Sequence, residues 1–256
     1  MKADSRVYFI GLFLALLIAA SAFSQGLYWE STTSGSMLGD KTNISQTYAM
    51  PKMFKIVSEA KIMILRLDQE KMYDVNPAAK TYSEMTFAEI EAYAKKAGDK
   101  MAQFNEKLKN LPPDQRKKME ALGALLPGKG GESPIQISAT GDTKTVSGFP
   151  CTKYVMTRGG KEFATLWVTK GVSGFENLRK DWLEFGKRMA SLTNMSGLGE
   201  AYLKVNGFPM ETDMEMMGNM TTVVTKVEKR STPASEFSVP AGFTKTESSL
   251  MKADEK

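Results

Sequence analysis

The sequence predicts an α+β domain built on an antiparallel β-sheet, and three features indicate this fold class. Short β-prone segments separated by tight turns occupy the region from residue 26 to residue 84. Two long stretches later in the chain carry apolar residues at helical spacing. Two hairpins with glycine-containing turns complete the pattern. We expect about eleven strands and three helices in one domain.

The first strands are expected to form an antiparallel meander, because they follow one another at close spacing. The mature region begins with a strand-like segment from Gly26 to Thr33. The other β-prone segments lie near 47–57, 61–67, 71–75 and 80–84.

Capping boxes mark the beginnings of two helices. Thr86 with Glu89, and Ser173 with Glu176, have the S/T-x-x-E spacing in which each residue satisfies a free backbone N–H of the other. Apolar residues then recur every three or four positions, so each helix has one apolar stripe. The expected helices span 86–111, 114–126 and 173–192.

A hairpin is expected at residues 151–168, because Gly159 and Gly160 accept the positive φ that a two-residue turn needs. That turn would place Met156 opposite Phe163. One face of the hairpin would then carry Tyr154, Met156, Phe163 and Trp167.

A second hairpin is expected at residues 206–228, with its turn at 217–220. This register would place Met214 opposite Val223, with Glu211 and Asp213 on the other face. The apolar face would carry Phe208, Met210, Met214, Met216, Val223 and Val227.

The N-terminus has the pattern of a secretory signal peptide over residues 1–24. Lys2 and Arg6 precede an apolar run from residue 7 to residue 20, and small residues follow it. We therefore expect an exported protein, periplasmic or extracellular, that is soluble after cleavage. The expected folded domain spans 25–243, and a polar flexible tail spans 244–256.

Composition argues against most enzyme classes and against nucleic-acid binding. The chain has no histidine and one cysteine, Cys151, so the usual general base and the usual zinc ligands are missing. Its net charge of +5 is spread among interspersed charges, without a basic stripe. The chain has 18 methionines, and methionine thioethers can bind Cu(I). However, the methionines clustered near residues 210–216 are explained by one apolar face of the expected hairpin. We expect no catalytic residue, no metal and no cofactor.

Several motifs resemble those of a known family. The segments that carry the resemblance are 27–31 (LYWES), 64–68, 72–77, 80–82, 148–154, 166–169 and 237–243 (FSVPAGF). Together they resemble an exported bacterial family known as domain of unknown function 4412. That family is distantly similar to the periplasmic lipoprotein carriers (LolA-like). The resemblance implies a curved half-barrel with about three helices on its concave face, which encloses an apolar cavity for acyl chains. It implies no catalytic residue.

The sequence therefore favours a non-enzymatic protein that binds a lipid, an acyl chain or another hydrophobic ligand. One alternative is a structural or interaction module with a solid core, whose partner is an envelope protein. Another is a carboxylate-dependent hydrolase. An apolar cavity would favour the first function, a filled core the second, and two buried facing carboxylates the third. The candidate ligand contacts are Tyr154, Met156, Phe163, Trp167, Phe208, Met210, Met214 and Met216.

Overall fold

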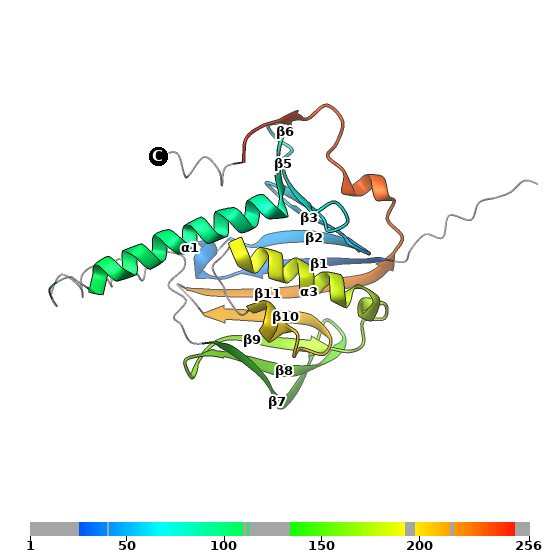
Figure 1. The fold of residues 1–256 in the computed structure, drawn as a ribbon. Helices are drawn as coiled ribbons and strands as arrows, with labels where there is room; N and C mark the ends of the chain where they lie inside the picture. Colours follow the sequence, from blue (N-terminus) through cyan, green and yellow to red (C-terminus); the bar gives the residue numbers. More distant parts are fainter. Residues whose placement is uncertain are drawn as a thin grey trace, which may run out of the picture.

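One large open sheet organises the chain (Figure 1). The computed structural model describes residues 26–39, 41–109, 112, 134–192, 198–215 and 218–248. Within these residues, twelve strands follow the order β12-β6-β5-β4-β3-β2-β1-β11-β10-β9-β8-β7. Neighbouring strands are antiparallel, except that β12 runs parallel to β6. The expected α+β fold, with a curved antiparallel sheet that does not close, is confirmed.

The strands vary from two to twelve residues in length. They are β1 (Gly26–Ser34), β2 (Asn43–Met50), β3 (Met53–Ser58), β4 (Ile62–Arg66), β5 (Lys71–Asn76), β6 (Thr81–Thr86), β7 (Ile135–Val146), β8 (Phe149–Arg158), β9 (Lys161–Thr169), β10 (Phe208–Glu215), β11 (Asn219–Arg230) and β12 (Thr244–Lys245). The first six form the expected meander, because each pairs with the next along the chain.

The helices of the described residues are α1 (Phe87–Lys109), α3 (Phe175–Leu192) and the short α4 (Leu198–Tyr202), besides the 3₁₀ turns η1 (Ser36–Leu38) and η2 (Ala234–Phe237). Of the two expected capping boxes, the one before α1 is present: Thr86 N donates to Glu89 Oε2 (2.7 Å), and Glu89 N donates to Thr86 Oγ1 (3.2 Å). Figure 1 shows α3 lying across β1, β11 and β10, whereas α1 extends beyond the ends of the strands. The helix expected over 114–126 lies outside the described residues.

The main core lies between α3 and the inner face of the sheet. Strand pairing aligns one buried side chain from each of β1 to β6 in a single row, which brings apolar groups into contact across six strands. Trp182 of α3 packs edge-on against Trp29, with 5.5 Å between the ring centroids. Its ring is tilted against that of Phe54, with 6.0 Å between the centroids. The row comprises Leu27, Ala49, Phe54, Leu65, Met72 and Met85.

A second apolar row continues on the same face in the other half of the sheet. It crosses β7 to β11 and contains Ile137, Met156, Ala164, Met214 and Met220. Most of these side chains pack in a separate cluster with α4. The inner face is therefore apolar on both sides of the β1–β11 centre.

The C-terminal segment covers the outer face of the meander. Phe237 is completely buried there against Met50, Ile64 and Val75. Beyond it, Thr244 N donates to Lys80 O (3.0 Å) as β12 adds to the edge strand β6. The polar tail expected from residue 244 is corrected here, because residues 244 and 245 pair with the sheet.

The β8–β9 hairpin has the expected turn but a different register. Arg158 pairs with Lys161 across the two glycines, yet an irregularity beside Met156 leaves Phe163 as an extra residue. Met156 therefore faces Ala164, not Phe163. Because side chains alternate along a strand, Trp167 lies on the face opposite Met156, contrary to the expectation.

The β10–β11 register also differs from the expected one. Glu215 pairs with Asn219, so three residues connect the strands, and Met214 faces Met220 where Val223 was expected. The register shift of three residues is odd, and an odd shift moves side chains to the other face. Val223 consequently lies opposite Glu211, so the expected separation of apolar and acidic faces is wrong for this residue.

Candidate functional site

The candidate site is an apolar cavity of about 290 Å³ between the inner face of the sheet and helices α3 and α4. Strands β8, β9 and β10 form its floor through Met156, Ala164, Thr212 and Met214. Met156 and Met214 flank Ala164 on neighbouring strands, so two long thioethers stand on either side of one methyl group. Ala164 is 4% exposed, so the two thioethers and the helices above cover most of its methyl group.

Helix α3 forms the roof of the cavity. Trp182, Phe185 and Met189 come from its apolar stripe, and Gly186 interrupts the stripe without a side chain. A Cβ added at Gly186 would have no heavy-atom neighbour within 4 Å. The roof therefore has open space at Gly186.

Helix α4 forms the side wall through Leu198, Gly199 and Tyr202. A Cβ at Gly199 would lie 3.3 Å from Lys187 Cβ, which is tighter than ordinary contact, so this glycine lets α4 approach α3 closely. Burial raises the pKa of Tyr202 to about 12. The Tyr202 hydroxyl forms no hydrogen bond with any described residue. It is one of the few polar groups in the lining of the cavity.

The size and chemistry of the cavity suit a small apolar ligand. Its volume is close to the lower end of the ~300–1,000 Å³ range of ligand pockets, and about twice that of a ~150 Å³ engineered cavity that binds benzene. The lining is made of aromatic, aliphatic and thioether groups, with polar atoms from Thr212 and Tyr202. Methionine adapts its shape to ligands because its side chain is flexible and polarisable.

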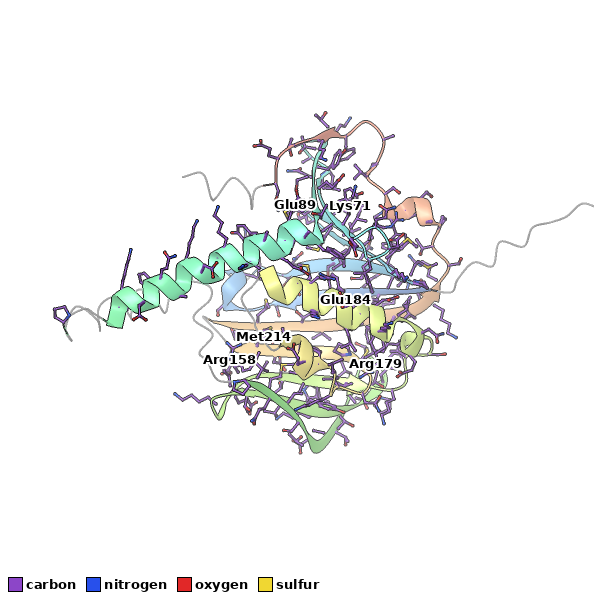
Figure 2. The ribbon with its side chains drawn as sticks, in the orientation of Figure 1. Lys71, Glu89, Arg158, Arg179, Glu184 and Met214 are labelled. Carbon is purple, nitrogen blue, oxygen red and sulfur yellow. The ribbon has the colours of Figure 1, made fainter. Side chains whose placement is uncertain are left out.

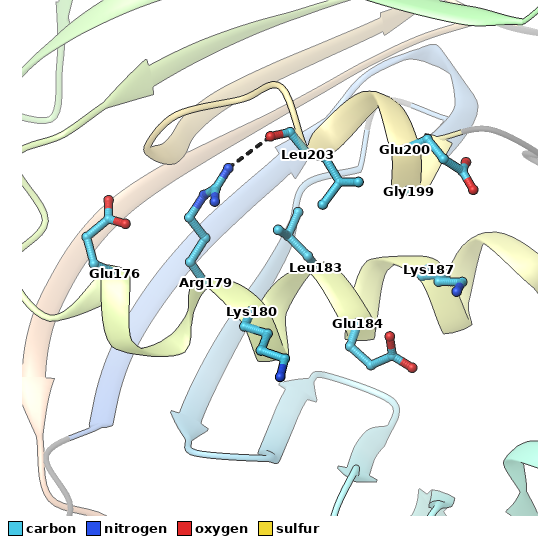
Figure 3. A pocket seen from close by; sticks show the side chains of 9 residues that line it. All are labelled: Glu176, Arg179, Lys180, Leu183, Glu184, Lys187, Gly199, Glu200 and Leu203. Carbon is cyan, nitrogen blue, oxygen red and sulfur yellow. Dashed lines mark hydrogen bonds between the residues drawn. The ribbon is translucent and has the colours of Figure 1, made fainter.

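A polar groove of about 480 Å³ adjoins the cavity on the solvent side of α3 and α4 (Figure 3). Arg179 bridges the two helices, and its Nη2 donates to Leu203 O (3.0 Å) and Val205 O (2.9 Å). These bonds satisfy carbonyls at the C-terminal end of α4 and in the following turn. Figure 2 labels Arg179 and Glu184 on α3. Met214 and Arg158 are labelled to the left, near the C-terminal ends of β10 and β8.

The residues expected from the sequence divide among three places. Met156 and Met214 line the cavity, and Tyr154 and Phe163 pack in the same apolar cluster beside it. Met216 lies outside the described residues.

The other three expected contacts lie away from the cavity. Phe208 and Met210 are 2% and 0% exposed in the main core. On the opposite face, Trp167 lies below Lys144, whose Nζ is 4.3 Å from the ring centroid and 2.7 Å from Glu211 Oε1.

Sequence reasoning identified the apolar stripe of α3 as a cover for the sheet but did not assign its residues to the site. Trp182, Phe185 and Met189 were recognisable from their helical spacing. Gly186 and Ala164 were missed, because a missing side chain gives no sequence signal for a cavity. α4 was also missed, because five residues give too short a periodic pattern.

Acid–base and metal chemistry have no recognisable centre in the described part of the chain. No Asp or Glu is buried among these residues, and no group of three or more His, Cys, Asp or Glu side chains is placed to hold a metal. Cys151 is 2% exposed, and burial raises the pKa of its thiol, which makes the thiol a poor nucleophile. No helix within the described ranges is long and apolar enough to cross a membrane.

Comparison with known proteins gives a family match over part of the chain. The sequence model of the family described as "Domain of unknown function (DUF4412)" matches residues 127–243, which confirms the expected resemblance over that segment. It includes β7 to β11 and both helices around the cavity. No curated protein matches the chain.

Solved structures resemble the chain only weakly. Two structures of PNGF-II have TM-scores of 0.39 at 8% and 11% identity, and each match covers 90% of this chain. The chain spans about a third of the length of PNGF-II, with 32% and 33% covered. The LolA superfamily protein NE2245 from Nitrosomonas europaea has a TM-score of 0.31 at 5% identity, with 84% of this chain and 90% of that protein covered.

Proposed function

We propose that the protein is an exported, non-enzymatic binding protein that holds a lipid or another hydrophobic ligand in the cavity beneath α3 and α4. The observation that carries this proposal is the apolar cavity of about 290 Å³ beneath α3, with open space at Gly186. A solid core would fill this space with side chains, since protein interiors pack with few voids larger than a water molecule.

Export to the periplasm or the medium is part of the proposal and rests on the signal-like pattern of residues 1–24. In an aqueous compartment, a chain that binds lipid must shield the ligand from water. The aromatic and thioether lining provides that shielding, because transfer of apolar surface from water is favourable by about 25 cal/mol per Å².

The test is binding of an apolar fluorescent probe, phenylnaphthylamine, to protein purified without detergent, followed by displacement with fatty acids. We expect wild-type protein to bind the probe and release it. Met214→Asp should weaken binding at least about tenfold, because a carboxylate in an apolar cavity loses its hydration.

The matched control is Met53→Asp. Met53 is also partly buried, but it packs against the outer-face cluster with Met50 and Phe237. This variant should bind the probe as wild-type protein does while it remains folded by circular dichroism. Absence of probe binding by folded wild-type protein would reject the carrier function and favour an interaction module with an envelope partner.

A further inference from the structure

The polar groove and the apolar cavity are neighbours that share part of their lining. Leu183 and Gly199 line both, so one leucine side chain and one glycine separate an apolar space from a solvent-exposed charged channel. A ligand that occupied the cavity and passed this boundary would place its other end in the groove shown in Figure 3.

Arg179 in the groove has hydrogen-bonding capacity that the described residues do not use. Its Nη2 is fixed by two backbone carbonyls, whereas its Nε is buried without a partner. Its Nη1 forms no hydrogen bond, and the guanidinium forms no ion pair, with the described side chains. A buried donor without an acceptor is costly and calls for a water molecule or a ligand as its partner.

Arg179 and Lys180 place two adjacent positive charges in this part of the groove. Lys180 follows it on the exposed side of α3 and forms no ion pair with a described residue. The acid nearest the middle of the groove, Glu184, is already paired with Arg188 (2.8 Å). Glu176 and Glu200 also line the groove and are exposed, so water screens their charges as it screens that of Lys180.

We propose that the ligand is an anionic amphiphile, whose apolar chain lies in the cavity and whose carboxylate or phosphate lies in the groove against Arg179 and Lys180. This inference rests on the proposed function and names the ligand class. The guanidinium suits an oxyanion because it presents fixed N–H donors in one plane, and pairing with an anion strengthens these hydrogen bonds.

The experiment compares laurate, lysophosphatidate with the same chain and dodecanol as competitors of phenylnaphthylamine at neutral pH. Both anionic amphiphiles should displace the probe at least about tenfold more effectively than the uncharged alcohol. Arg179→Gln and Lys180→Gln should each reduce this preference without weakening the displacement by dodecanol. The control is Lys95→Gln, on an exposed position of α1, which should retain the full preference.

The outcomes distinguish failure of the anionic head group from failure of the cavity as a binding site. Preference for laurate over lysophosphatidate assigns the head group to a free carboxylate, and the reverse assigns it to a phospholipid. Equal displacement by dodecanol and the anions, unchanged in Lys180→Gln, would overturn the anionic head group while the cavity remained a binding site. Lys180→Gln keeps the test valid if Arg179→Gln fails to fold, because Lys180 supports no carbonyl.

Discussion

Filling the gap in the roof of the cavity provides the sharpest test of the site. Gly186 lies in α3 with no atom within 4 Å of an added Cβ, and Gly98 lies in α1 with equally open surroundings. Of these two glycines, Gly186 lines the cavity and Gly98 does not. Gly186→Leu and Gly98→Leu therefore make the same chemical change in two helices, and the cavity is the difference between them.

The expected stabilities follow from two contributions. Replacing a helical glycine by leucine gains about 0.8 kcal/mol in either helix from backbone propensity. At Gly186 the new side chain also moves into apolar surroundings, and complete burial of a leucine is worth about 1.5–3 kcal/mol. We expect Gly186→Leu to gain about 2–4 kcal/mol and Gly98→Leu about 1 kcal/mol. At about 2–4 °C per kcal/mol, the melting temperatures should rise by roughly 4–16 °C and 2–4 °C.

Ligand binding should change in the opposite direction to stability. The leucine at Gly186 occupies space that the probe needs, so affinity for phenylnaphthylamine should fall at least about tenfold. Gly186→Ala, which adds one methyl group, should keep most of the binding and gain about 1 kcal/mol. Thermal melts and probe titrations of the same preparations measure both effects.

Two results would refute this reasoning. If Gly186→Leu is less stable than Gly98→Leu, the space beneath α3 is already filled and overpacking strains the core. If Gly186→Leu is stabilised but binds the probe as wild-type protein does, the ligand occupies another part of the molecule. Neither result is compatible with a ligand held beneath α3 beside Gly186.

The outer face and its ion pairs give two further predictions. Phe237→Ala should lower the free energy of unfolding by about 3–5 kcal/mol, because it removes a completely buried ring. Urea titrations measure this loss, and a loss no larger than that of Val239→Ala would contradict the prediction. Lys71, 2.9 Å away, lowers the pKa of Glu84, so the pair stabilises the fold above the ordinary carboxyl pKa of 4.5 and the effect disappears as pH falls through the lowered pKa. Glu84→Gln should therefore cost up to about 1 kcal/mol at neutral pH and nothing in strong acid, whereas Glu59→Gln should be neutral throughout.

The sequence by itself determined the local structure and the fold class. The Thr86–Glu89 box placed the start of α1 correctly, because capping depends on residues three positions apart. The glycines at 159 and 160 located the β8–β9 turn, since few other residues adopt positive φ. The spacing of Trp182, Phe185 and Met189 indicated the apolar side of α3, and Met156 and Met214, both named from the sequence, line the cavity in the structure.

Only the tertiary structure decided which side chains meet across the strands. One extra residue at Phe163 and a three-residue connection after Glu215 each changed a register, and an odd register shift moves side chains to the opposite face. Such shifts depend on the packing of the whole sheet, which no short segment encodes. The cavity is also a tertiary property, because residues of three strands and two helices line it together, and small residues such as Ala164 and Gly186 do not differ in sequence from ordinary sites in a strand or a helix.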